Sequence, residues 1–96
     1  MDFTKEQIVD FKAKHGEIFK IKVDGKSCLL RKPNRKELGY ASVAGKENPL
    51  KFNEVILNSC WLAGDEEIRT NDTLFLSASA KIAEIIEVKE AELEKL

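Results

Sequence analysis

The sequence lacks any apolar run close to the roughly 20 residues that a membrane-spanning helix needs. Its first seven residues, Met-Asp-Phe-Thr-Lys-Glu-Gln, carry charges where the hydrophobic region of a signal peptide would lie. We therefore expect a soluble protein that stays in the cytoplasm. A chain of 96 residues is also too short for two separate hydrophobic cores, so residues 1–96 are predicted to form a single domain.

Residues that carry catalysis or bind metals are scarce. His15 is the one histidine, and Cys28 and Cys60 form no C-x-x-C pair, which excludes a zinc site built from cysteine and histidine alone. No glycine-rich phosphate-binding motif and no serine nucleophile motif is present. The acidic cluster at 65–67 lacks the ligand spacing of a calcium loop, so we interpret it as a solvated turn. We expect no enzymatic activity, no catalytic residue, no cofactor and no metal ion.

Charge is abundant and unevenly placed. The 16 basic and 17 acidic residues give a net charge of −1. Residues 12–36 hold nine lysines and arginines against Glu17 and Asp24, whereas residues 65–96 hold nine acidic residues against four basic ones. The sequence therefore predicts a basic surface from its first half and an acidic surface from its last third.

Alternating apolar residues on both sides of Asp24-Gly25 predict a β-hairpin with a two-residue turn. A helix precedes this hairpin, because Thr4 and Gln7 have capping-box spacing and Gly16 can end a helix. The predicted pairs are Val23 with Lys26, Ile21 with Cys28, and Phe19 with Leu30. One face of the hairpin is expected to be buried, while the other is expected to be in water and to carry Lys20, Lys22, Ser27, Leu29 and Arg31.

Three helices are predicted after the hairpin. Asn34 begins the first, Asn48-Pro49 begins a central apolar helix over 50–63, and the last helix covers about 72–94. The apolar pattern weakens after Val88, so residues 89–96 are expected to be a frayed or projecting helix end. The predicted fold is α+β and mostly helical: an N-terminal helix, a β-hairpin, then three helices packed on one face of the hairpin.

Two charged surfaces and two aromatic residues are the candidates for partner binding. The basic surface is the outer hairpin face, the acidic surface is a stripe on the last helix that includes Glu90 and Glu94, and the aromatic residues belong to the central helix. Both aromatic residues fit burial in the core, and Trp61 also fits the anchor of an interface. The candidate partner-binding residues are Lys20, Lys22, Arg31, Phe52, Trp61, Glu84 and Glu87.

These surfaces suit two kinds of partner. Opposite charges on one small protein allow docking on a charged protein partner or self-association into a homo-oligomer. The basic hairpin face also fits a small nucleic-acid-binding module. That alternative is less favoured, because no aromatic residue lies on this face to stack on bases and the isoelectric point is about 5.9.

Three stretches together resemble a known family. They are the hairpin residues 19–26, the basic link Leu30-Arg31-Lys32-Pro33-Asn34-Arg35, and residues 52–68, which include Val55-Ile56-Leu57-Asn58-Ser59-Cys60-Trp61-Leu62 and Gly64-Asp65-Glu66-Glu67-Ile68. In order and spacing they resemble the tail assembly chaperones of siphophages and prophages. The resemblance implies a non-enzymatic chaperone of virion morphogenesis in the bacterial host cytoplasm. Such proteins bind the tape-measure protein and help to recruit tail-tube subunits.

Overall fold

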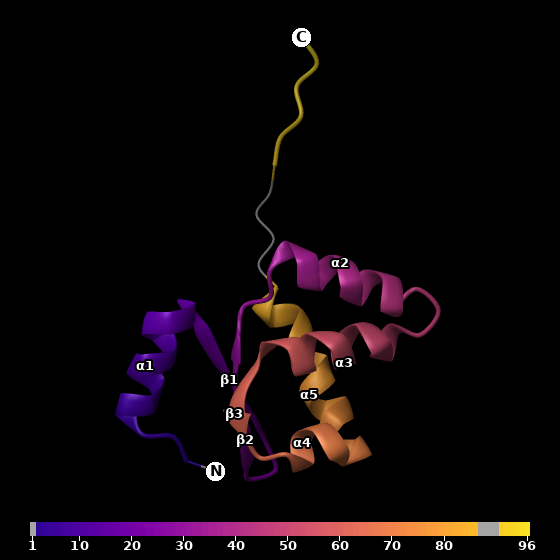
Figure 1. The fold of residues 1–96 in the computed structure, drawn as a ribbon. Helices are drawn as coiled ribbons and strands as arrows, with labels where there is room; N and C mark the ends of the chain where they lie inside the picture. The colour runs from indigo at the N-terminus through magenta and orange to yellow at the C-terminus, as the bar shows by residue number, and fades with distance from the viewer. Residues whose placement is uncertain (1, 87–90) are drawn as a thin grey trace.

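Residues 2–86 and 91–96, which the computed structural model describes, contain five helices and three strands (Figure 1). In chain order they are α1 (Lys5–His15), β1 (Ile18–Val23), β2 (Lys26–Arg31), α2 (Arg35–Ala44), α3 (Pro49–Cys60), β3 (Trp61–Gly64), α4 (Glu67–Thr70) and α5 (Asp72–Ile85). The α+β prediction with an N-terminal helix and a hairpin is confirmed. Among the described residues, no helix is long and apolar enough to cross a membrane.

The hairpin forms in the predicted register. Val23 pairs with Lys26, Ile21 with Cys28, and Phe19 with Leu30. The two turn residues, Asp24 and Gly25, have φ values of 47° and 75°, as a turn with two left-handed residues requires. The predicted helix starts are also confirmed, since Thr4, Asn34 and Asn48 each accept a backbone hydrogen bond from their helix.

A third strand replaces the predicted end of the central helix. The prediction of a helix over 50–63 is wrong at its end, because α3 stops at Cys60 and Trp61 is extended, with φ −63° and ψ 124°. β3 then pairs antiparallel with β2, which gives the sheet order β1-β2-β3. This pairing supplies hydrogen-bond partners to the side of β2 that β1 does not use. The acidic turn that follows leads into the short helix α4, so four helices follow the hairpin.

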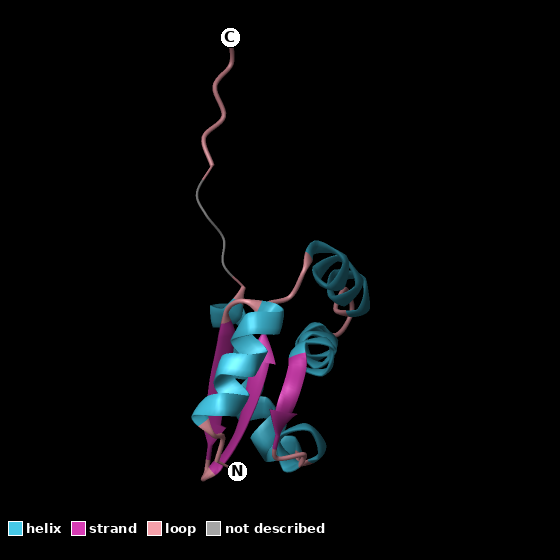
Figure 2. Ribbon diagram, turned by 60° about the vertical axis from the view of Figure 1, so that its left-hand side comes forward, coloured by secondary structure: helices cyan, strands magenta, loops and turns pink. Residues whose placement is uncertain are grey.

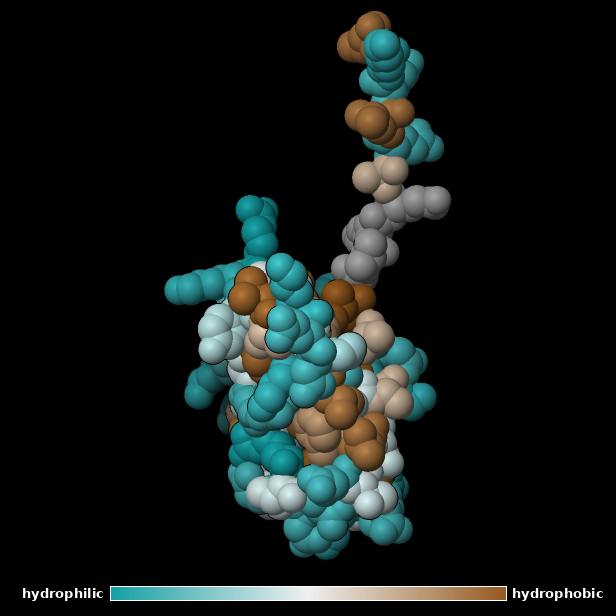
Figure 3. All heavy atoms as spheres, turned by 90° about the vertical axis from the view of Figure 1, so that its right-hand side faces the viewer, coloured by the Kyte–Doolittle hydropathy of each residue, from teal (hydrophilic) through white to brown (hydrophobic). Residues whose placement is uncertain are grey.

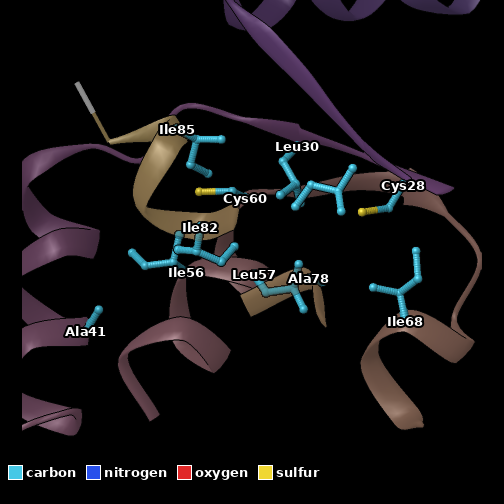
Figure 4. Close-up of a cluster of buried hydrophobic side chains, with 11 residues drawn as sticks. Cys28, Leu30, Ala41, Ile56, Leu57, Cys60, Ile68, Ala78, Ile82 and Ile85 are labelled. Atoms are coloured by element: carbon cyan, nitrogen blue, oxygen red, sulfur yellow. The ribbon is translucent and has the colours of Figure 1, made fainter. Parts of the chain in front are cut away.

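The main core lies between the sheet and the later helices. Buried side chains of β1 and β2 meet those of α3, α4 and α5, while α2 packs mainly against α3 (Figure 4). α1 lies on the opposite side of the sheet, as Figures 1 and 2 show from two directions. The core cluster consists of Ile21, Cys28, Leu30, Ala41, Ile56, Leu57, Cys60, Ile68, Ala78, Ile82 and Ile85.

The second face of the hairpin is not uniformly in water. Lys20 and Lys22 are exposed as predicted, but Ser27 and Leu29 are only 3% and 2% exposed. β2 is the central strand, with β1 on one side and β3 on the other, and α1 lies over this face. The prediction treated the hairpin as a two-stranded unit and so left β2 uncovered.

The last helix is shorter than predicted. α5 ends at Ile85, and residues 91–96 are exposed and form neither helix nor strand. The predicted acidic stripe therefore does not continue along one helix to Glu94. Glu87 and Glu90 lie outside the described residues. Leu93 and Leu96 are fully exposed, so residues 91–96 bury no apolar face that would stabilise helical turns.

Candidate protein-binding groove

The three basic residues predicted to bind a partner have different surroundings. Lys20 and Lys22 are exposed on β1, with Lys20 Nζ 5.9 Å from the centre of the Phe3 ring. Arg31 forms an ion pair inside the fold, because its Nη1 and Nη2 lie 2.8 Å and 2.5 Å from the Glu37 carboxylate oxygens. Arg31 Nη2 also donates to the backbone oxygen of Ser59 at 2.7 Å. Arg31 is therefore a structural residue joining β2, α2 and α3.

Other members of the basic surface are also paired. Lys26 lies 3.3 Å from Glu67, and Lys32 lies 3.5 Å from Glu17. These exposed pairs are weak in energy, but they place negative charge beside the lysines. The basic face is thereby partly neutralised, which reduces its attraction for a phosphate backbone.

Phe52 and Trp61 are both half-buried and pack against the core. A Cβ atom built on Gly45 would lie 2.7 Å from Phe52 Cβ, so Phe52 contacts the end of α2 closely. Trp61 lies on β3, and the Arg69 guanidinium is 4.0 Å from its ring centre, a cation–π distance. Both aromatic residues thus support the fold, and Trp61 does so next to a surface groove.

A groove of about 490 Å³ lies between α3 and the α4–α5 segment. Leu50 and Leu76 line it although they are 43% and 51% exposed, and the half-buried Phe75 lies beside them. Figure 3 views the side of the molecule that carries the α2–α3 connection and α4, where apolar residues reach the surface between hydrophilic ones. The remaining lining residues are Asn48, Lys51, Glu54, Leu57, Asn58, Arg69 and Asp72.

Charged side chains surround the apolar part of the groove. Lys51 lies 3.5 Å from Glu54 one turn along α3, and Arg69 is paired with Glu66. Arg69 Nε is buried and has no hydrogen-bond partner among the described residues. The groove therefore offers an apolar strip with ions of both signs around it.

A smaller depression of about 260 Å³ brings the two predicted charged surfaces together. Lys20 and Lys22 of β1 and Glu84 of α5 all line it, with the exposed Lys81. Lys81 and Glu84 form an ion pair at 3.3 Å. The charge distribution along the sequence had suggested an acidic surface separate from the basic one. Glu84, the member of the predicted acidic stripe that lies on α5, instead lies beside the basic strand.

Sequence reasoning missed Leu50, Leu76 and Arg69 as surface residues. Leu50 falls in the apolar helix predicted to be buried, but it lies in the first turn of α3, where it is only partly covered. Leu76 lies outside the 3–4 spacing of Phe75, Ala78 and Ile82, and this mismatch is the signal that marks an apolar residue as exposed. Arg69 has no comparable signal.

The described residues offer little that would support metal or nucleophile chemistry. They contain no group of three or more histidine, cysteine, aspartate or glutamate side chains placed to hold a metal ion. Cys28 and Cys60 are free thiols buried in the core, and burial raises the pKa of each to about 11. At neutral pH both are therefore protonated, which makes them poor nucleophiles.

Comparisons of this chain with protein-family models, with curated proteins and with solved structures give no match. Function is therefore inferred from the surface features described above, and chiefly from the groove.

Proposed function

We propose that this chain is a non-enzymatic binding protein whose groove between α3 and α5 holds an amphipathic helix of a partner protein. The observation that carries this proposal is the exposure of Leu50 and Leu76 on two facing elements of one groove. An amphipathic helix buries apolar side chains at i, i+3, i+4 and i+7 in such a surface. Burial of these leucines and Phe75 would supply the affinity, and the charges around them would select the partner.

The resemblance to tail assembly chaperones supplies a partner class. In this proposal the helix belongs to a tape-measure protein, a long helical chain that must be kept soluble, and the complex forms in the bacterial host cytoplasm. Recruitment of tail-tube subunits would follow from the same family role. A groove with apolar and charged residues suits such a chain. It can cover the apolar stripe along one face of a helix, and many different helix sequences present such a stripe.

Nucleic-acid binding by the hairpin has less support. Lys20 and Lys22 remain exposed, but Arg31, Lys26 and Lys32 lie beside carboxylates. The exposed lysines also share a depression with the Lys81–Glu84 ion pair, so only Lys20 and Lys22 add net positive charge there. A small basic surface of this kind gives only weak, salt-sensitive attraction.

The test is co-expression with the tape-measure protein of the same phage or prophage, followed by co-purification. The wild type is expected to form a complex and to raise the soluble yield of the partner. Leu76→Glu places a charge in the groove and is expected to weaken binding at least about tenfold, which corresponds to about 1.4 kcal/mol. Val9→Glu is the matched control, because Val9 is 62% exposed on α1 and does not line the groove.

If Leu76→Glu binds the partner as tightly as the wild type does, the groove is not the binding site. If the wild type forms no complex and the soluble yield does not rise, the tape-measure protein is not the partner. Circular dichroism of both variants verifies that each one folds, which is expected because both positions are exposed.

A further inference from the structure

We infer that the outer edge of β1 is a docking site for residues 91–96 of a second copy of this chain, which add to the sheet as a fourth strand. The strand order β1-β2-β3 leaves β1 at the edge. Among the described residues, no strand pairs with this side of β1. An edge strand presents backbone donors and acceptors that an extended segment can pair with.

The register shows which backbone groups of β1 face outward. The Ser27 N–H donates to Asp65 Oδ2 at 2.9 Å, and the Ser27 C=O accepts from the Asp65 N–H at 2.9 Å. Both backbone groups of Ser27 therefore point toward Asp65 and away from β1. Ser27 is paired opposite Lys22, so Lys22 directs its own N–H and C=O away from β2. The same alternation places the N–H and C=O of Lys20 at the outer edge.

The side chains of the edge and of the segment share a two-residue period. Phe19, Ile21 and Val23 lie on the core face of β1, and Lys20 and Lys22 lie on the other face. The segment Ala91-Glu92-Leu93-Glu94-Lys95-Leu96 alternates apolar and acidic residues over its first four positions. In antiparallel pairing with Leu93 opposite Ile21, Glu92 lies beside Lys22 and Glu94 beside Lys20. Such cross-strand pairs of opposite charge are favourable.

The depression beside β1 has the composition that this pairing needs. Phe19, Ile21 and Ile85 supply apolar surface for Leu93. The charged residues around it are three lysines and one glutamate, Lys20, Lys22, Lys81 and Glu84, so the rim is positive overall. Lysines on an edge disfavour pairing with ordinary strands, and an acidic segment removes that penalty.

A second copy is the occupant that the structure favours. Residues 91–96 lead away from the body of the molecule in both Figure 1 and Figure 2, and Leu93 and Leu96 are fully exposed. The segment is therefore placed to reach a neighbouring molecule. Reciprocal exchange of segments between two copies gives a closed dimer with two-fold symmetry.

The first experiment measures the mass of the full chain in solution by light scattering, at concentrations up to about 1 mM, where weak strand addition is populated. The expected result is a dimer of the 10.9 kDa chain that becomes a monomer when residues 91–96 are deleted. The deletion leaves the fold intact, because these residues are exposed and lie outside the helices and strands. A monomeric full chain, or a dimer that survives the deletion, would overturn the proposal.

The second experiment tests the charge pairing. The double change Lys20→Glu and Lys22→Glu is expected to weaken the dimer at least about tenfold, and combining it with Glu92→Lys and Glu94→Lys is expected to restore it. Lys12→Glu with Lys14→Glu is the matched control, since it changes the net charge equally on exposed positions of α1. Equal weakening by the control pair, or no rescue by the four-fold variant, would contradict pairing at the β1 edge.

Discussion

Arg31 and Glu37 form a two-pronged ion pair that ties the end of β2 to the first turn of α2. Arg31 Nη1 lies 2.8 Å from Glu37 Oε1, and Nη2 lies 2.5 Å from Oε2. Glu37 Oε1 also accepts the backbone N–H of Asn34 at 3.0 Å, and Arg31 reaches the backbone oxygen of Ser59 at the end of α3. One arginine thus joins three elements around the point where the chain leaves the sheet.

Replacing Arg31 with lysine is expected to destabilise the fold by about 1–3 kcal/mol, because an ammonium group cannot make the paired hydrogen bonds of a guanidinium. The side chains of Arg31 and Glu37 are 24% and 19% exposed, so water replaces the lost bonds only in part. Urea unfolding measures the effect. Arg35→Lys is the control, because Arg35 is exposed at the start of α2, and an equal loss there would show that the ion pair is not the cause.

The same ion pair makes stability depend on pH. The hydrogen bonds from Arg31 hold the pKa of the Glu37 carboxyl below its ordinary value. A lowered pKa in the folded state stabilises the protein above the ordinary glutamate pKa, and this contribution is lost as the pH falls through the folded-state value. The free energy of unfolding of the wild type is therefore expected to approach that of Glu37→Gln between about pH 5 and pH 3. A constant difference over this range would exclude the linkage.

Local signals were sufficient for the hairpin and for the helix starts. Asp24-Gly25 fixes the strand register through its turn geometry, and the caps at Thr4, Asn34 and Asn48 are short-range hydrogen bonds that neighbouring residues determine. These features depend on few residues, so a single sequence is enough to predict them.

Long-range pairing was not predictable in the same way. β3 continues the apolar run of α3 without a break, and only its pairing with β2 makes Trp61–Gly64 a strand. The burial of Leu29 and the commitment of Arg31 to Glu37 follow from that arrangement and from α1 covering the sheet. The groove was missed for a related reason: an exposed leucine such as Leu76 is recognised only once the facing helix is known.

Gly64→Ala is expected to destabilise the protein by at least about 2 kcal/mol. Gly64 has φ +150°, and a Cβ atom there would lie 2.5 Å from Cys28 Cα and 2.7 Å from the Ser27 backbone oxygen, so rigid backbone would have to move. Gly39→Ala is the matched control. It lies inside α2 with nothing within 4 Å of an added Cβ, and it is expected to stabilise the helix by about 0.5–1 kcal/mol. In thermal unfolding, the melting temperature should fall for Gly64→Ala and rise for Gly39→Ala.

The two cysteines are expected to react only when the protein unfolds. Cys28 and Cys60 are fully buried, and burial raises the pKa of both thiols to about 11. Because the folded-state pKa is raised, stability present below the ordinary thiol pKa is lost as the pH rises toward 11. A thiol reagent at pH 8 should modify both residues together, at a rate that follows urea unfolding. Rapid labelling of one thiol in the native protein would contradict their burial.

Arg69→Ala is expected to expose Trp61, the one tryptophan of the chain, because the guanidinium lies over its ring at 4.0 Å. Quenching of tryptophan fluorescence by acrylamide should increase, and stability should fall by about 0.5–2 kcal/mol from the lost cation–π contact. Glu66→Gln separates the causes, because it removes the ion pair of Arg69 and leaves the ring contact in place. If Glu66→Gln raises quenching as much as Arg69→Ala does, the ion pair and not the stacking protects the ring. Since Arg69 also lines the groove, binding of a helix there should reduce quenching in the wild type.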